Sequence, residues 1–223
     1  MSEILKVENL KKHFIKKGMF GSKSNTVKAA DGVSFYLKEG EVFVLAGESG
    51  SGKSTIAKLI LKSIQLDSGK IFFEEDEIGN EQSKIQKIRM NCQMIHQDPY
   101  DSINPRMRIG DIVSEPLEIH KIGNKSEKQK RVMEVLHEVK LEPAEEITKK
   151  YPHMLSGGQR QRVVLARALA LKPKIILADE PVSMLDVSIR AEMLELMQEL
   201  QKKYNISFIY ITHDLATARY FGQ

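Results

Sequence analysis

The stretch "GESGSGKST" (residues 47–55) combines glycines, a lysine and hydroxyl side chains in a spacing suited to binding a triphosphate. It fits the pattern G-x-x-x-x-G-K-[ST] and lies between a short apolar run and a helical pattern, as that motif requires. The glycines let backbone N–H groups point at phosphate oxygens, and the start of a helix adds positive partial charge. An ordinary strand–turn–helix is the weaker alternative. The residues expected to contact a nucleotide are Gly47, Glu48, Ser49, Gly50, Ser51, Gly52, Lys53, Ser54 and Thr55.

The last three of these residues have separate expected tasks. Lys53 is expected to reach the β- and γ-phosphates and to stabilise charge there during reaction. Ser54 is expected to offer its hydroxyl to Mg²⁺, and Thr55 to help hold the inner phosphates.

Two adjacent carboxylates, Asp179 and Glu180, end the apolar run "IILADE". Asp179 can orient the water shell of a metal ion, and Glu180, pointing to the other side, could polarise an attacking water. Acidic residues at strand ends are often simply solvated. The phosphate-binding pattern in the same chain favours the catalytic interpretation.

His213 and Gln97 follow two further apolar runs. Parallel strands deliver their carboxyl ends to one edge of the sheet, where ligands bind, so His213 is expected beside Glu180. Gln97 could ligate Mg²⁺ there and report the γ-phosphate to neighbouring helices, although a polar residue before a turn is unremarkable alone. The other histidines lack such a position and are interpreted as structural; they are His13, His96, His120, His137 and His153.

A second glycine-bearing helix start occurs at "LSGGQRQR" (residues 155–162). Ser156 and Gln159 have the spacing of a capping box, which explains the serine and the glutamine without any ligand. Gly157 and Gly158 stay unexplained, because glycine in a helix costs about 0.5–1 kcal/mol relative to alanine. A bare helix start can bind an anion. The chain thus has two helix starts that could bind the phosphates of one nucleotide, but they are expected in different lobes of the molecule. We therefore predict that two molecules, arranged head to tail, share each nucleotide.

The elements that position these residues form an α/β pattern. Short apolar runs at residues 42–46, 174–179 and 207–212 predict strands buried on both faces, and helical patterns alternate with them. This alternation predicts crossover units and a mostly parallel sheet. One helix is expected over 189–204, with an apolar stripe of Ile189, Met193, Leu196, Met197, Leu200 and Tyr204.

Between about residues 98 and 157 the buried-strand runs disappear and helical segments follow, which predicts a helical insertion into the core. One helix is expected to begin at "SEKQ", where Ser126 and Gln129 have capping-box spacing. Residues 16–25, "KKGMFGSKSN", are expected to form the most mobile loop.

Composition excludes several classes of protein. The chain has 41% hydrophobic and 29% charged residues, as in soluble globular proteins. Its formal charge of +4 comes without a long basic run interleaved with aromatics, so no nucleic-acid partner is expected. A single cysteine excludes an intrachain disulfide and a cysteine-based metal site. No secretory signal and no apolar run near the roughly 20 residues of a membrane span is present, so the chain is not expected to cross a bilayer.

Together these motifs resemble the ATP-binding subunit of an ABC transporter. The resemblance covers essentially the whole chain, with the phosphate loop, Gln97 of the Q-loop, the signature "LSGGQ", the carboxylate pair, the D-loop "SMLDVS" (residues 183–188) and His213 in order. It implies a P-loop NTPase core and two such domains sandwiching two ATP molecules. Glu180 would be the general base, and His213 would position the γ-phosphate and water. The signature residues Ser156, Gly157, Gly158 and Gln159 would contact the partner's γ-phosphate, with Asp186 linking the two sites.

The resemblance also implies one domain over residues 1–223, with a core of about 1–98 and 162–223 and a helical subdomain of about 99–161. Relatives continue beyond His213, so the C-terminal part of the family domain is expected to be absent. His96 and Met184 depart from the usual pattern, and neither touches the chemistry. Phe14 matches the aromatic that stacks on adenine, although a core aromatic at a strand end fits equally well.

The segments "VKAADGVSF", "HQDPYDSINPRM" and "GDIVSEPL" are similar to the dipeptide and oligopeptide importer branch. That branch implies a second ATPase subunit, identical or paralogous, and two membrane permease subunits, one of which places a coupling helix in a groove after Gln97. An extracellular substrate-binding protein would act indirectly. The chain would lie peripherally on the cytoplasmic face of the membrane. Alternatives are an importer of a non-peptide substrate, a soluble ABC-type ATPase acting on nucleic acid, and a nucleotide-binding subunit without turnover; Glu180 and His213 argue against the last.

Overall fold

The structure is a computed structural model and describes residues 2–16 and 25–222. The loop predicted over residues 16–25 lies outside the described residues except for its two ends.

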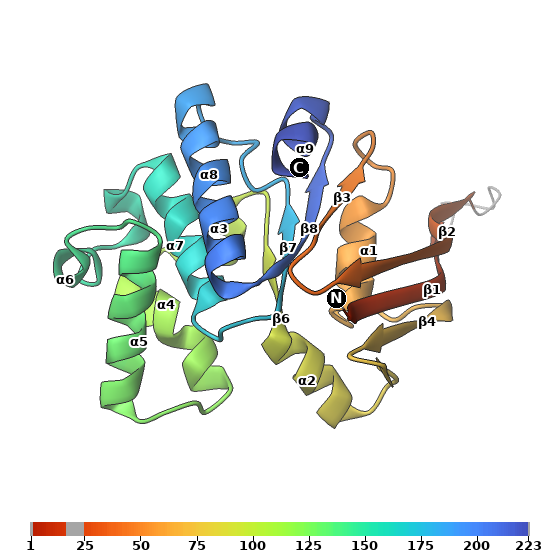
Figure 1. Cartoon of the computed structure of the whole chain (residues 1–223), viewed down its shortest axis with the longest axis horizontal. Coiled ribbons are helices and arrows are strands. Elements are labelled where there is room, and N and C mark those ends of the chain that lie inside the picture. The colour runs from red at the N-terminus through yellow and green to blue at the C-terminus, as the bar shows by residue number, and fades with distance from the viewer. Residues whose placement is uncertain (1, 17–24, 223) are drawn as a thin grey trace.

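A parallel sheet occupies the centre of the molecule (Figure 1). Its order is β3 (Val42–Ala46), β8 (Ser207–Thr212), β7 (Ile175–Asp179) and β6 (Cys92–Ile95), and every neighbouring pair is parallel. The predicted parallel sheet is therefore confirmed. β7 and β8 are buried at every position, as their continuous apolar sequences predict.

Successive residues of the central strands enter two different cores. Ile175 and Leu177 of β7 belong to a cluster on one face, whereas Ile176 and Ala178 belong to a cluster on the opposite face. This is the alternation expected of a strand covered on both sides. β3 differs from the expectation, because it is only partly buried. It lies at the edge of the sheet and is paired with β8 alone.

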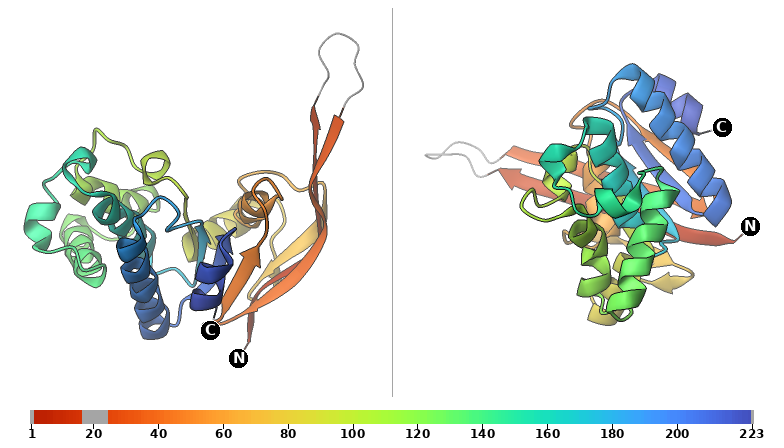
Figure 2. Two further views of the ribbon diagram at one scale, coloured as in Figure 1. Left: turned by 90° about the horizontal axis from the view of Figure 1, so that it is seen from above. Right: turned by 90° about the vertical axis from the view of Figure 1, so that its left-hand side faces the viewer.

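An antiparallel sheet lies on one side of the parallel sheet (Figures 1 and 2). Its order is β2 (Asn25–Lys38), β1 (Glu3–Lys16), β4 (Ser68–Phe73) and β5 (Asp76–Glu77). These strands are not among the elements expected from the sequence. They mix charged and apolar residues, and register shifts interrupt the β1–β2 pairing, so no continuous apolar run marks them.

Helix α1 (Lys53–Ile60) lies between the two sheets, with Ile56, Leu59 and Ile60 in the core that they share. α2 (Gln82–Asn91) leads into β6. The remaining helices cover the opposite face of the parallel sheet or extend from it; they are α3 (Pro99–Ser102), α4 (Ile109–Ile119), α5 (Lys125–Glu138), α6 (Ala144–Ile147), the 3-10 helix η1 (Pro152–Met154), α7 (Gly157–Leu169), α8 (Val187–Tyr204) and α9 (Leu215–Phe221).

The start of α5 corrects a sequence expectation. The predicted capping pair, Ser126 and Gln129, is wrong: the N-cap is Asn124, whose side chain accepts hydrogen bonds from the backbone N–H groups of Ser126 and Glu127. Glu127 completes the capping box by accepting from the N–H of Asn124 at 2.7 Å. The helix therefore begins two residues earlier than expected.

Helix α8 follows the predicted stripe except at its end. Met193, Leu196, Met197 and Leu200 are buried, whereas Tyr204 is exposed. The helix stops there because Asn205 adopts a left-handed conformation, with φ of 53°.

Helix α7 runs unbroken across the boundary expected between the helical subdomain and the core at residues 161 and 162. It packs on α4 and α5 and also on β6, so it joins the helical part to the sheet. The division into core and subdomain stays a prediction. Among the described residues, no helix is both long enough and apolar enough to span a membrane.

Candidate nucleotide site

The loop between β3 and α1 contains a position that only glycine can fill. Gly52 is the N-cap of α1 and has a φ of 93°, in the region that side chains rarely adopt. A Cβ atom there would lie 1.9 Å from the carbonyl oxygen of Ala29 on β2. Strand β2 of the antiparallel sheet therefore packs directly against this loop. Gly52 is fixed by both its conformation and its packing.

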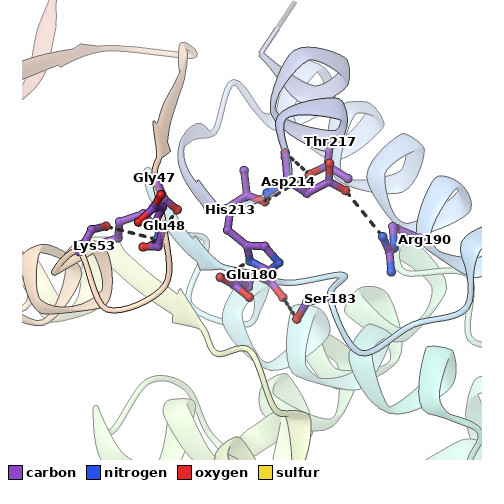
Figure 3. Close-up of polar contacts among 11 residues, drawn as sticks. Gly47, Glu48, Lys53, Glu180, Ser183, Arg190, His213, Asp214 and Thr217 are labelled. Atoms are coloured by element: carbon purple, nitrogen blue, oxygen red, sulfur yellow. Dashed lines mark hydrogen bonds and ion pairs between the residues drawn. The ribbon is translucent and has the colours of Figure 1, made fainter.

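Lys53 folds back over the same loop (Figure 3). Its ammonium donates to the carbonyl oxygens of Gly47 at 2.8 Å and Glu48 at 2.7 Å, and the residue is buried. Ser54 and Thr55 follow in the first turn of α1. The loop therefore surrounds a positive charge with exposed backbone at the start of a helix, which is the arrangement that binds phosphate.

Asp179 ends β7 and is buried, with 8% of its surface exposed. Burial raises the pKa of this carboxyl, while the Ser54 hydroxyl and the charges of His96 and Lys53 oppose that rise. The carboxylate therefore lies next to the first turn of α1, as the sequence predicts. His96, interpreted from sequence as structural only, is close enough to act on Asp179 electrostatically.

Glu180 turns sharply away from the strand. Its φ of 48° is unusual for a residue other than glycine, and its N–H donates to the carbonyl of Ile211 at 2.9 Å. This backbone conformation directs its side chain towards His213, whose Nδ1 lies 2.7 Å from Glu180 Oε1 (Figure 3). The Glu180 side chain is 11% exposed and that of His213 is 54% exposed, so the pair lies at the surface edge of the sheet.

The end of β8 brings His213 next to the phosphate-binding loop. The N–H of Gly47 donates to the carbonyl of Thr212 at 3.3 Å, one residue before His213. Lys53, Asp179, Glu180 and His213 thus meet at the carboxyl edge of the parallel sheet, as the order of the strands predicts.

Gln97 lies in a bend after β6 and is exposed. The next residue, Asp98, caps α3 by accepting from the N–H of Tyr100 at 2.8 Å. The ring of Tyr100 stacks against the Arg160 guanidinium of α7, with 4.5 Å between the ring centroid and Cζ. This contact, which sequence reasoning missed, connects the Gln97 segment to the helix that carries the second glycine pair.

The start of α7 has the predicted capping box. Ser156 Oγ accepts from the N–H of Gln159 at 3.3 Å, and Gln159 Oε1 accepts from the N–H of Ser156 at 3.0 Å. Both side chains are therefore engaged within the chain, which confirms the structural explanation of this pair.

The two glycines after Ser156 have different explanations. A Cβ on Gly158 would lie 2.6 Å from Ile189 Cγ2 on α8, so close helix packing requires glycine there. Packing against Ile189 is therefore a reason for glycine at this position that the sequence did not show, and the predicted ligand contact stays a prediction. A Cβ on Gly157 would meet only Leu185 Cδ2, at an ordinary 3.9 Å. No contact within the described part of the chain therefore explains why residue 157 is a glycine.

The two glycine-bearing helix starts belong to opposite faces of the parallel sheet. α1 packs in the core shared with the antiparallel sheet, whereas α7 packs in the core of the helical face. Asp186, the N-cap of α8, is exposed and makes no capping hydrogen bond through its side chain.

Large apolar side chains stay exposed in the segments around these sites. Met184 (63% exposed) and Val187 (81%) flank Asp186, Leu215 (73%) follows His213, and Met154 (57%) precedes Ser156. Exposed apolar side chains of this size are available to a partner surface.

Phe14 lies near the end of β1 and is 42% exposed, so it is not a core aromatic. The Lys12 ammonium lies 5.5 Å from its ring centroid. The exposed ring offers a face on which a base can stack, and this role stays a prediction.

The polar groups beside the loop fit a magnesium ion held largely by a nucleotide. Among residues 2–16 and 25–222, no three or more histidine, cysteine, aspartate or glutamate side chains gather as a metal site. Mg²⁺ bound with phosphates needs only one or two protein oxygens, because it keeps several waters. The Ser54 hydroxyl and the buried Asp179 carboxylate supply that chemistry.

The chain is similar to known ABC transporter proteins. A family model described as "ABC transporter" matches residues 30–183. The oligopeptide transport ATP-binding protein AppF of Bacillus subtilis (strain 168) is 44% identical over 222 residues, covering 98% of this chain and 67% of that protein. The dipeptide transport ATP-binding protein DppF of Escherichia coli (strain K12) is 41% identical over 221 residues, covering 98% and 65%. The chain spans about two thirds of the length of these relatives.

A solved structure has the same fold over nearly the whole chain. It is the dimeric structure of a post-hydrolysis state of the ATP-binding cassette MJ0796 bound to ADP and Pi. The TM-score is 0.82 at 30% sequence identity, and the match covers 97% of this chain and 90% of that one.

Proposed function

Since the chain belongs to the ABC transporter family, we propose that it binds Mg-ATP, pairs with a second ATPase domain around the nucleotide, and hydrolyses it to power peptide uptake through a membrane permease. The observation that carries this proposal is the meeting of Lys53, Asp179, Glu180 and His213 at one sheet edge, while the glycine-bearing start of α7 lies on the other face.

In the proposed site the loop of residues 47–55 wraps the phosphates. Lys53 exchanges its hydrogen bonds to the loop carbonyls for the β- and γ-phosphates, where its charge stabilises the transition state. Mg²⁺, when bound, would neutralise phosphate charge; Ser54 and Gln97 would hold it, and Asp179 would orient its waters.

Hydrolysis in this proposal uses Glu180 as the general base. It accepts a proton from a water whose oxygen bonds to the γ-phosphorus, while the bond to the β-phosphate oxygen breaks and ADP leaves. His213 holds the Glu180 carboxylate through the 2.7 Å contact and orients the γ-phosphate and the water.

The second ATPase domain completes the site with the start of its own α7. The N–H groups at Gly157 and Gly158 and the Ser156 hydroxyl then face the γ-phosphate held by the partner, and Asp186 lies between the two sites. The exposed Met184, Val187 and Leu215 side chains supply apolar surface for this pairing. The partner domain is an identical or paralogous subunit.

A polar hollow of about 360 Å³ among α2, β6, the end of α3 and α7 offers a place for a membrane partner. Arg89, Gln93, Ser102 and Arg167 line it. We assign it to a coupling helix from one of two permease subunits, with the chain lying peripherally on the cytoplasmic face of the membrane. An extracellular substrate-binding protein acts only through those subunits.

The peptide assignment rests on the relatives, two of which are named for oligopeptide and dipeptide transport at 41–44% identity. Stimulation of turnover by DNA or RNA, rather than by permease subunits in lipid, would favour a soluble nucleic-acid ATPase instead. A non-peptide substrate recovered with the assembled transporter would correct the substrate class.

Lys53→Ala tests nucleotide binding by the loop. We expect the dissociation constant for Mg-ATP, measured by titration calorimetry, to rise about 10- to 100-fold, because charge-assisted contacts to phosphate are lost. The control is Lys58→Ala, an exposed lysine on the same helix that should leave affinity unchanged. Equal affinity of Lys53→Ala and the unmodified protein would count against the loop as the phosphate site.

A further inference from the structure

A cavity of about 360 Å³ lies beside the Glu180–His213 pair, on the side of α8 and α9. Its lining includes Ser183 of the D-loop, together with Arg190 and Asp214, which the sequence motifs do not assign. Arg190 extends into this region from α8 and Asp214 from the start of α9 (Figure 3).

Arg190 makes two contacts with two different loops. One guanidinium nitrogen, Nη2, donates to the carbonyl of Leu185 in the D-loop at 3.2 Å. Another, Nη1, lies 3.7 Å from Asp214 Oδ2 in an ion pair. The third nitrogen, Nε, is buried and has no hydrogen-bond partner within the described part of the chain. The side chain therefore bridges the D-loop and the loop that carries His213.

Both ends of this bridge are fixed by backbone hydrogen bonds. The N–H of Arg190 donates to the carbonyl of Asp186 at 2.8 Å, which holds it in the first turn of α8. Asp214 uses its other oxygen, Oδ1, to cap α9 through the N–H of Ala216 at 2.9 Å, and its own N–H donates to Thr212 Oγ1 at 3.0 Å. One guanidinium therefore links the D-loop to the start of α9.

The bridge contributes little to folding by itself. The two side chains are 30% and 37% exposed, and ion pairs of that exposure have small effects on stability. The position of the bridge is more important than its energy. One of its ends, Leu185, is adjacent to Asp186 of the D-loop, and the other, Asp214, is adjacent to His213. Small errors in the placement of reacting groups can reduce turnover strongly.

We propose that Arg190 is a positioning residue for hydrolysis, which holds the D-loop and the His213 loop in one fixed relation through Leu185 and Asp214. This inference rests on the proposed ATPase function. Arg190 does not touch the nucleotide. It acts by keeping His213 aligned with Glu180 while the D-loop contacts the second domain.

Two variants remove the bridge from opposite ends. Arg190→Met replaces the aliphatic part of the side chain with one of similar length and loses the guanidinium. Asp214→Asn loses the charge and keeps the oxygen that caps α9. In the complex with the permease subunits we expect kcat to fall about tenfold in each variant, with the ATP dissociation constant unchanged. The double variant should be no slower than the slower single variant, because both changes break one contact. Arg190→Lys should have a higher kcat than Arg190→Met, since lysine keeps the positive charge but lacks the planar guanidinium that can contact two acceptors at once.

Arg131→Met is the matched control. Arg131 also bridges main-chain carbonyls, those of Leu169 and Ala170, and pairs with Glu134, but on α5 away from the site. This control should lower the melting temperature without changing kcat. Additive losses in the double variant, or unmodified kcat in Arg190→Met and Asp214→Asn, would overturn the positioning role while leaving the ATPase assignment intact. Absence of ATP binding and turnover in the unmodified complex would overturn both.

Discussion

Replacing Glu180 with glutamine should abolish most ATP hydrolysis while leaving ATP binding intact. The substitution keeps the size of the side chain and its contact distance to His213, yet an amide cannot accept the proton of the attacking water. We expect kcat to fall by about 10²- to 10⁴-fold, measured as phosphate release by the assembled transporter. The dissociation constant for Mg-ATP should change less than about twofold, because Lys53 and the loop amides are untouched.

The complementary variant is Glu180→Asp, which keeps the carboxylate and shortens it. A general base needs the carboxylate in reach of the water, so this variant should retain more activity than Glu180→Gln but less than the unmodified protein. Unchanged turnover in Glu180→Gln would remove Glu180 from the role of base and require another proton acceptor.

Gly157→Asp should block turnover that depends on two domains. A Cβ at this position meets only Leu185 Cδ2 at 3.9 Å, so the chain itself can accept a side chain there. A carboxylate in the first turn of a helix is moreover favourable for the helix. We therefore expect an unchanged or slightly raised melting temperature, and a loss of kcat of about 10²-fold because the negative charge faces the partner's γ-phosphate.

Two controls separate charge, bulk and folding at this helix start. Gly157→Asn has the same size without the charge and should lose less activity than Gly157→Asp. Gly158→Ala should instead lower stability by about 1–3 kcal/mol, because its Cβ would overlap Ile189 Cγ2. Normal turnover in Gly157→Asp would contradict a phosphate contact at this position.

The fold could be predicted where the sequence signal depends on local burial. β7 and β8 are covered on both faces, so each reads as one continuous apolar run. The partial burial of β3 could not be predicted, because it depends on β3 having only one neighbour in the sheet. The antiparallel strands were missed for a related reason, since charged residues interrupt them.

Helix starts show the limit of spacing alone. Two overlapping capping patterns, one from Asn124 and one from Ser126, lie two residues apart at the start of α5. Both patterns have the residue types and the spacing of a capping box. In the folded chain the N-cap is Asn124, and the helix that follows buries Val132, Val135 and Leu136. The start of α7 offered no competing pattern, and Ser156 was predicted correctly.

The convergence of the site followed from topology, because parallel strands deliver Asp179, Glu180 and His213 to one edge. Contacts between distant side chains did not follow from the sequence. The need for glycine at 158 comes from Ile189, and the bridge of Arg190 to Asp214 joins two loops. The one available signal for Asp214 was its place before a helix, where aspartate commonly caps.

The central claim is that each ATP is held between two domains, by Lys53 and the loop amides of one domain and by the glycine-bearing start of α7 of the other. The most direct measurement is a structure of the complete transporter carrying Glu180→Gln and loaded with Mg-ATP. We predict that the N–H groups at residues 157 and 158 lie about 3 Å from oxygens of the γ-phosphate bound to the opposite domain. An ATP-loaded complex in which residues 156–159 contact no phosphate would contradict the account.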